Sequence, residues 1–133
     1  VYDDYAHHPT EIKEVINGVK NCYKDKKIIC IFQPHRTSRL NDLKKDFCSS
    51  FKKANSLILC PIYKAGENIK LNFNYHKFSE QIKKKSKVHV FLVNDQYELA
   101  KFLKNYLSPK NIAIGMGAGS ISNWIKELPG LMK

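Results

Sequence analysis

Two arginines that stand three residues apart are the strongest chemical signal in the sequence. The chain has 23 lysines and arginines among its 133 residues, and only Arg36 and Arg39 are arginines. A guanidinium group is a planar fork that binds a carboxylate or a phosphate through two parallel hydrogen bonds, whereas lysine offers a point charge. His35 directly precedes the pair. The segment therefore predicts an anion site, with His35, Arg36 and Arg39 as substrate-binding residues.

Acids and histidines are concentrated near the start of the chain, in the run Asp3-Asp4-Tyr5-Ala6-His7-His8-Pro9-Thr10-Glu11. A carboxylate at the end of a strand suits the hydroxyls of a ribose, so Asp4 is a candidate nucleotide-binding residue. His7, in the same loop, is a candidate for nucleotide and substrate binding. Thr10 is expected to cap the helix that follows, and Pro9 to fix its first turn. The two histidines leave metal binding open, but the sequence suggests no third ligand, so no metal site is predicted in this chain.

A glycine-rich segment near the C-terminal end, Gly115-Met116-Gly117-Ala118-Gly119-Ser120, is placed to open the last helix. Glycines let a ligand approach the backbone, and free amides at a helix start attract anions. Because residue 120 is serine, the spacing is not the GxGxxG dinucleotide fingerprint, and a tight turn that only packs helix on sheet is an alternative. The candidate substrate-binding residues of this loop are Gly117, Ala118, Gly119 and Ser120. No Walker A sequence is present, so a complete ATPase is not expected.

Each of these segments follows a short apolar run of the kind that forms a buried strand. Most of the runs lack alternation with polar residues, which is typical of parallel strands covered on both faces. There are five of them, at residues 2–5, 27–32, 56–61, 88–93 and 111–116. Amphipathic helical stripes separate them and begin at Ile12, Leu40, Phe78, Leu99 and Ile121. Pro129-Gly130 is expected to end the last helix.

This alternation of strand and helix predicts one Rossmann-like α/β domain, with a doubly wound, mostly parallel sheet and helices on both faces. In such sheets, ligands bind beyond the C-terminal ends of the strands. The three polar segments follow three of those ends. We therefore expect Asp4, His7, His35 and Arg36 along one edge of the sheet, with the loop of residues 117–120 beside them.

The composition bears on partners and compartment. The net charge is +11, but the lysines are scattered over the predicted helices without the aromatic and basic interleaving of RNA-binding proteins, so no nucleic-acid partner is predicted. An anionic small substrate fits the charge. No apolar run approaches about 20 residues, so no membrane association is predicted. The four cysteines lack metal-ligand spacing and are expected to be buried, reduced thiols of a cytoplasmic protein: Cys22, Cys30, Cys48 and Cys60.

Together these segments resemble the C-terminal domain of the Mur ligases. The resemblance rests on four motifs in the family's order, which span essentially the whole chain: DDYAHHPTE at 3–11, FQPHR at 32–36, Ile62-Tyr63 with Ala65-Gly66-Glu67, and GAGSI at 117–121. Thr37 stands where an aromatic residue is common, and Lys64 is not typical of the family. These departures concern only local contacts.

The resemblance implies that residues 1–133 are the amino-acid-binding C-terminal domain of a three-domain, ATP-dependent ligase. An N-terminal domain would hold UDP-N-acetylmuramate, and a central domain would hold ATP and Mg2+. Both are expected to lie outside this chain, which opens in a strand without an initiating methionine. The implied reaction joins L-alanine to UDP-N-acetylmuramate through an acyl phosphate, in peptidoglycan synthesis for cell-wall biogenesis, cell shape and cell division. The isolated domain is expected to be inactive.

By resemblance, Asp4 would hold the ATP ribose. The closed site near the γ-phosphate and the alanine would be lined by His7, His35, Arg36 and Arg39. By the same resemblance, Tyr5 and the loop of residues 117–120 would adjoin the bound substrate. No residue of the chain is expected to act as a covalent catalyst, because the domain contributes positioning and closure.

Two alternatives to the alanine ligase stay open. One is a related ligase that recycles a tripeptide onto UDP-N-acetylmuramate and carries a similar HHP loop. The other is a stand-alone module that binds an anion or a nucleotide. The pattern of Tyr5 with Thr10-Glu11 favours the alanine ligase over the tripeptide ligase.

Overall fold

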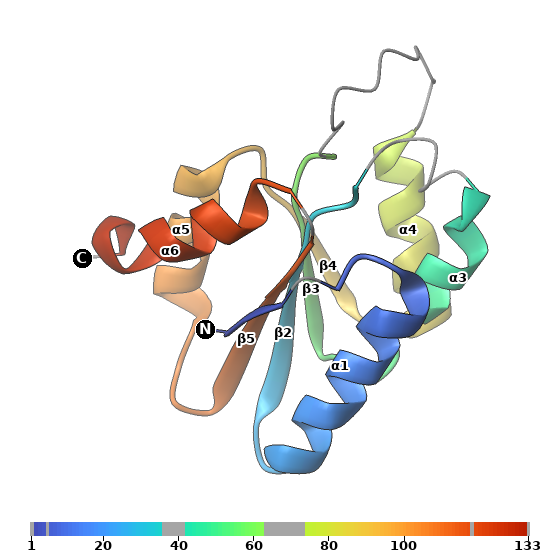
Figure 1. The fold of residues 1–133 in the computed structure, drawn as a ribbon, viewed down its shortest axis with the longest axis horizontal. Helices are drawn as coiled ribbons and strands as arrows, with labels where there is room; N and C mark the ends of the chain where they lie inside the picture. The colour runs from blue at the N-terminus through green and yellow to red at the C-terminus, as the bar shows by residue number, and fades with distance from the viewer. Residues whose placement is uncertain (1, 5, 36–41, 63–73, 118, 133) are drawn as a thin grey trace.

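Five strands form one parallel sheet in the computed structural model of the chain (Figure 1). The structure describes residues 2–4, 6–35, 42–62, 74–117 and 119–132. The strands are β1 (Tyr2–Asp4), β2 (Lys27–Phe32), β3 (Ser56–Leu59), β4 (His89–Leu92) and β5 (Asn111–Met116). They lie in the order β1-β5-β2-β3-β4, and every neighbouring pair is parallel. The predicted parallel α/β sheet is therefore confirmed.

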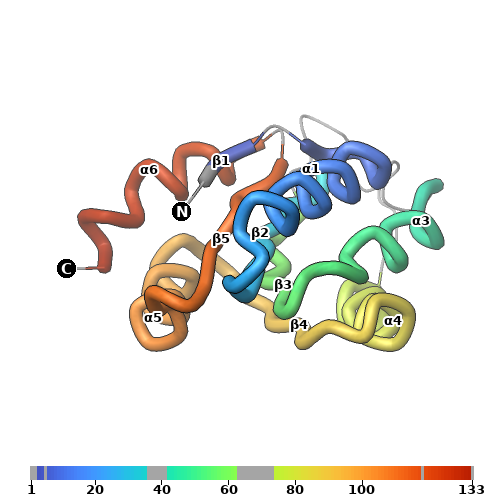
Figure 2. Tube along the Cα trace, turned by 90° about the horizontal axis from the view of Figure 1, so that it is seen from below, coloured from blue at the N-terminus to red at the C-terminus, as the bar shows by residue number. Residues whose placement is uncertain are grey.

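Helices cover both faces of the sheet, as predicted (Figure 2). One face carries α1 (Pro9–Cys22), α3 (Lys44–Ser49) and α4 (Tyr75–Ser86), and the other carries α5 (Gln96–Tyr106) and α6 (Ile121–Leu131). Strand β2 shows the sequence origin of this arrangement. Its alternate residues Ile28, Cys30 and Phe32 enter the core under α1, α3 and α4, while Ile29 and Ile31 enter the core under α5 and α6. A strand that feeds two cores needs an uninterrupted apolar run.

Strand β4 lies at the edge of the sheet and is less buried than its neighbour β3. His89 and Leu92 are exposed, whereas Val90 and Phe91 are partly buried. Val90 packs on the core under α1, α3 and α4, and the Phe91 ring packs on Phe102 of α5 with 4.7 Å between ring centroids. Both faces of this predicted strand are therefore covered, but only in part.

Three element boundaries also differ from the sequence-based expectation. The strand expected at 56–61 ends at Leu59, and the helix expected at 78–85 extends over Tyr75–Ser86. Pro129 lies inside α6 and does not end it. Proline cannot donate a hydrogen bond and its ring crowds the carbonyl four residues earlier, which agrees with α6 ending only two residues later, at Leu131.

All four cysteines are free thiols. Cys30, Cys48 and Cys60 are buried as predicted, but Cys22 is exposed at the end of α1, where the helix faces solvent. Burial raises the pKa of the Cys30 thiol, and raises that of Cys60 to about 12. Within the described ranges, no helix combines the length and apolarity that crossing a bilayer requires.

Candidate functional site

The C-terminal ends of three adjacent strands meet at one level of the sheet. Asp4 ends β1 and pairs with Met116 of β5, and Phe32 ends β2 and pairs with the same Met116. Two backbone hydrogen bonds continue this level beyond the strands: Gly117 N–H donates to the Asp4 carbonyl at 3.3 Å, and Gln33 N–H donates to the Met116 carbonyl at 3.0 Å. The loops after β1, β5 and β2 therefore leave the sheet side by side.

This arrangement brings together the predicted site residues that the structure describes. The His7 ring, from the loop after β1, lies 5.8 Å from the His35 ring, from the loop after β2, between centroids and with a tilt of 56°. Both rings are partly buried. Two imidazoles from different loops thus lie against one another at the strand ends.

The Asp4 carboxylate is held in place by its own loop. Its Oδ1 accepts a hydrogen bond from Ala6 N–H at 3.0 Å, while the residue itself is exposed. This hydrogen bond restrains the Asp4 side chain, but its second carboxylate oxygen can still accept a hydrogen bond from a ligand hydroxyl.

The helix cap after β1 is His8 and not Thr10, which corrects the sequence-based expectation. His8 Nδ1 accepts from Thr10 N–H at 3.3 Å, and Glu11 Oε1 accepts from His8 N–H at 3.2 Å, which is the reciprocal arrangement of a capping box. Pro9 takes the first helical position, as expected. The same Glu11 oxygen lies 3.9 Å from His7 Nδ1, so the helix start also orients His7.

Gln33 joins the loop after β2 to the start of α6, a role that the sequence did not reveal. Its side chain is 3% exposed and makes two hydrogen bonds across the sheet edge. Nε2 donates to Ser120 Oγ at 2.8 Å, and Oε1 accepts from the buried Ile121 N–H at 2.9 Å. Ser120 provides no side-chain cap of its own to α6. A buried amide from another strand therefore satisfies the first N–H of this helix.

Gly117 is required by geometry. Its φ is +152°, and a Cβ built there would lie 2.8 Å from Ile121 Cγ2 and 2.9 Å from the Gln33 carbonyl oxygen. Any larger residue would push the loop away from α6 or from the strand end of β2. The loop therefore forms the tight turn that was the alternative to ligand binding. The close approach of its backbone to α6 and to the end of β2 explains why residue 117 is glycine.

Several predicted site residues lie outside the described residues: Tyr5, Arg36, Arg39 and Ala118. His35 is the last described residue before the two arginines, and it lies at the shared edge. Gly119 and Ser120 are partly buried at the start of α6, beside Gln33. Among the described residues, no group of three or more His, Cys, Asp and Glu side chains is placed to hold a metal ion.

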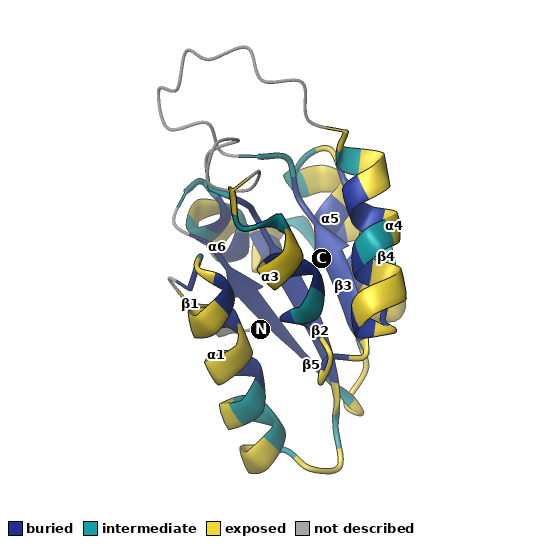
Figure 3. Cartoon of the chain, turned by 90° about the vertical axis from the view of Figure 1, so that its right-hand side faces the viewer, coloured by how far each residue is buried: buried dark blue, intermediate teal, exposed yellow. Residues whose placement is uncertain are grey.

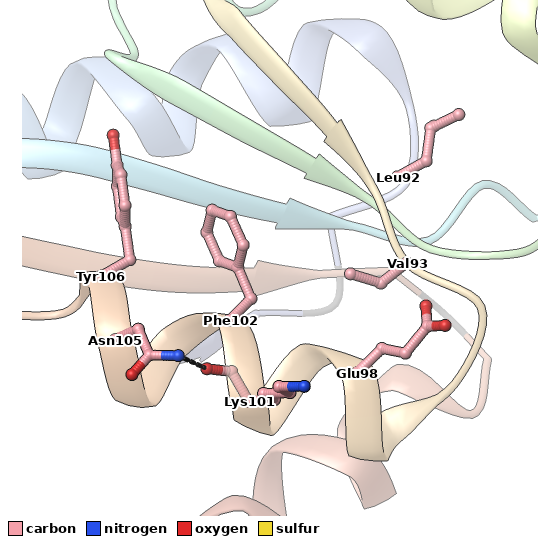
Figure 4. Close-up of a pocket in the computed structure, with 7 residues that line it drawn as sticks. All are labelled: Leu92, Val93, Glu98, Lys101, Phe102, Asn105 and Tyr106. Atoms are coloured by element: carbon pink, nitrogen blue, oxygen red, sulfur yellow. Dashed lines mark hydrogen bonds between the residues drawn. The ribbon is translucent and has the colours of Figure 1, made fainter.

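An apolar pocket lies away from this edge, between β4 and α5, and has a volume of about 400 Å³ (Figure 4). Leu92, Phe102 and Tyr106 form its apolar wall, and Glu98 and Lys101 lie at its rim. It contains none of the predicted site residues. Strands β3 and β2 separate it from β5.

Comparison with known proteins gives one consistent family. The family model described as Mur ligase, glutamate ligase domain, matches residues 1–119. The UDP-N-acetylmuramate–L-alanine ligase of Pelagibacter ubique is 63% identical over 131 residues, which are 98% of this chain and 28% of that protein. The chain thus spans little more than a quarter of the length of this relative.

Solved structures of similar proteins share the fold. The UDP-N-acetylmuramate–alanine ligase of Thermotoga maritima matches with a TM-score of 0.73 and 24% identity, over 96% of this chain and 25% of that one. A murein peptide ligase from Psychrobacter arcticus matches with a TM-score of 0.73 and 18% identity, over 97% of this chain and 26% of that one. At these identities the likeness concerns the fold alone.

Proposed function

Because the chain belongs to the Mur ligase family, through its glutamate ligase domain, we propose that it acts as the C-terminal domain of an ATP-dependent ligase that joins L-alanine to UDP-N-acetylmuramate. The observation that carries the proposal is the meeting of three loops at one sheet edge, with Asp4, His7 and His35 together. The 63% identity to an alanine ligase of this kind supports the choice of substrate.

In this proposal, ATP supplies the phosphoryl group that activates the muramyl carboxylate as an acyl phosphate, and the alanine amine then displaces phosphate. The chain contributes groups that bind and orient. The carboxylate of Asp4, restrained by Ala6 N–H, accepts hydrogen bonds from the ribose hydroxyls of ATP.

The histidines and arginines complete the proposed site on the substrate side. His7 and His35 face one another across the loops after β1 and β2, where their ring N–H groups can donate to phosphoryl or carboxylate oxygens. Arg36 and Arg39 follow His35 in the chain and would bind the same anionic groups as bidentate partners. Gly117, Ala118, Gly119, Ser120 and Tyr5 would adjoin the bound substrates.

The remaining machinery belongs to other parts of the protein in this proposal. The chain covers 28% of its Pelagibacter relative, and we assign Mg2+ and the ATP phosphates to a central domain and the UDP-sugar to an N-terminal one. The 133 residues then form one domain that closes over both. The buried free thiols suit the reducing cytoplasm, where we locate the reaction.

The test is the steady-state kinetics of the whole enzyme with Asp4 changed to asparagine. The amide keeps the oxygen that accepts from Ala6 N–H but loses the charge, so we expect KM for ATP to rise roughly tenfold with little change in the melting temperature. Asp25→Asn is the matched control, because Asp25 is an exposed acid in the turn between α1 and β2, at the opposite end of the sheet. If the two substitutions change the KM for ATP equally, Asp4 does not bind ATP.

Substrate choice separates the alternatives. Phosphate release from ATP should depend on UDP-N-acetylmuramate and L-alanine together, and the 133-residue chain alone should release none. A preference for the tripeptide over L-alanine would support the recycling ligase, whose fold the chain also matches. Binding of nucleotide without any ligation by the whole protein would support a stand-alone binding module.

A further inference from the structure

Helices α3 and α4, with the few residues that follow each of them, carry much of the positive charge of the chain, and the proposed ligase site does not use it. Residues 44–53 and 75–87 contain nine lysines against two acids, Asp46 and Glu80. These two segments therefore supply seven of the eleven net positive charges. Figure 3 shows the largely exposed outer sides of both helices next to one another, in front of the buried strands.

Four of these lysines surround one groove between the two helices. The groove has a volume of about 600 Å³ and is lined by Lys44, Lys45 and Lys52 from the α3 side and by Lys85 from α4. Its described lining contains no acidic side chain. A volume of this size falls within the range of about 300–1,000 Å³ that is usual for small-molecule sites.

The acids of the two segments do not neutralise the groove. Asp46 lines an adjoining hollow, and Glu80 lies 4.0 Å from Lys83, which is not a lining residue. Among the described residues, Lys45, Lys52 and Lys85 form no salt bridge. The ammonium groups of these three lysines thus repel one another, and a bound anion would relieve this repulsion.

Two further contacts show that the groove is held together and that its charges converge. The buried Ser86 hydroxyl of α4 donates to the Cys48 carbonyl of α3, and accepts from Phe51 N–H at 3.3 Å just beyond α3. Burial raises the pKa of the Cys48 thiol, and the ammonium groups of Lys44 and Lys85 act against this shift from either helix. Walls that are joined in this way need little reorganisation to bind a ligand.

We propose that the groove between α3 and α4 binds a small anion that carries two or more phosphate groups. Lysine is a common phosphate ligand that acts as a point charge, and four lysines on two walls match a compact, multiply charged group. The side-chain amide of Gln81 adds a neutral donor to the lining, beside Lys85. A single-stranded nucleic acid fits less well, since the described residues of the lining include no aromatic side chain on which a base could stack.

The experiment measures binding of inorganic tripolyphosphate to the chain by calorimetry at about 0.15 M salt, where long-range attraction is screened. The variant is K45Q/K52Q/K85Q, which changes three exposed side chains. The control is K101Q/K104Q/K126Q, which removes the same charge from α5 and α6 on the other face of the sheet. We expect the groove variant to raise Kd about tenfold or more, as three screened ion pairs permit, and the control to leave it within about twofold.

A second readout does not depend on the variants. Backbone amide NMR shifts of the unaltered chain should move at Ser49, Lys52 and Gln81 on adding tripolyphosphate, and should not move at Lys101 or Lys126. Three results would each overturn the proposal. These are equal weakening of tripolyphosphate binding in both triple variants, NMR shifts spread evenly over all lysines, and a chain that binds an oligonucleotide but not tripolyphosphate. Ligase activity plays no part in these measurements, so their outcome is independent of the proposed function.

Discussion

The hydrogen bonds of Gln33 allow a quantitative prediction, because they are the contacts that connect β2 to the start of α6. Gln33→Met keeps the length of an unbranched side chain but removes both polar atoms. The buried Ile121 N–H then loses its partner, and Ser120 Oγ loses the donor at 2.8 Å. An orphaned buried N–H costs about 1–3 kcal/mol, and a lost hydrogen bond about 1 kcal/mol. Burial of the apolar methionine offsets part of this loss, so we expect the free energy of unfolding to fall by about 2–3 kcal/mol.

The assay is thermal unfolding of the 133-residue chain, followed by circular dichroism. For a domain of this size the expected loss corresponds to a melting temperature lower by roughly 8–12 °C. Ser120→Ala is the matched control, because it removes the Ser120 bond and leaves the Ile121 N–H capped, and it should cost only about 1 kcal/mol. Two results would contradict this prediction: a melting temperature of Gln33→Met equal to that of the wild type, or a Ser120→Ala variant that is as destabilised as Gln33→Met.

Three other predictions follow from the glycine loop, the arginine pair and the thiols. Gly117→Ala should lower the free energy of unfolding by about 2–4 kcal/mol in a denaturant titration, because Gly117 has a positive φ and a Cβ there would make close contacts. The control is Gly18→Ala in α1, where no atom lies within 4 Å of the new Cβ. This substitution should raise the free energy of unfolding by about 0.5–1 kcal/mol. Arg36→Lys in the whole enzyme should lower kcat/KM roughly 10- to 100-fold without changing the melting temperature, and unchanged kinetics would deny Arg36 an anion-binding role. Cys22 should react with a thiol reagent in the native chain, while the buried Cys30 should not. Folding raises the pKa of the Cys30 thiol above its ordinary 9.0, so just above pH 9 this thiol ionises only in the unfolded chain. The free energy of unfolding should therefore fall as the pH rises past 9.0.

The strands and helices could be predicted from the sequence because local sequence patterns determine secondary structure. An uninterrupted apolar run such as KIICIF indicates a strand with two covered faces, and the alternation with amphipathic helices indicates parallel connections. Local patterns do not decide what depends on tertiary context. The run at 88–93 predicts a strand, which forms as β4, but it does not show that this strand lies at the edge, because neighbour order in a sheet is a long-range property. Pro129 was taken for a helix end, but α6 continues through it.

The candidate site was predictable in part for the same reason. The sequence shows that Asp4, His35 and Gly117 each come just after a strand, and strand ends of a parallel sheet share an edge. It does not show that β5 lies between β1 and β2, which places all three loops at the level of Met116. The contribution of Gln33 was hidden because its partner is 88 residues away in the chain, at Ile121.

The position of Gln33 has a consequence for the proposed site. Its backbone N–H is fixed to β5, its side chain is fixed to α6, and His35 lies only two residues further along the same loop. A shift of α6 relative to β2 would therefore be transmitted to His35 through a buried hydrogen-bonded amide, and His35 faces His7 from the third loop. The three loops thus behave as one unit, and binding groups distributed among them keep their relative positions when the domain moves as a whole. Preorganisation of this kind is what a domain that positions substrates without covalent chemistry has to supply.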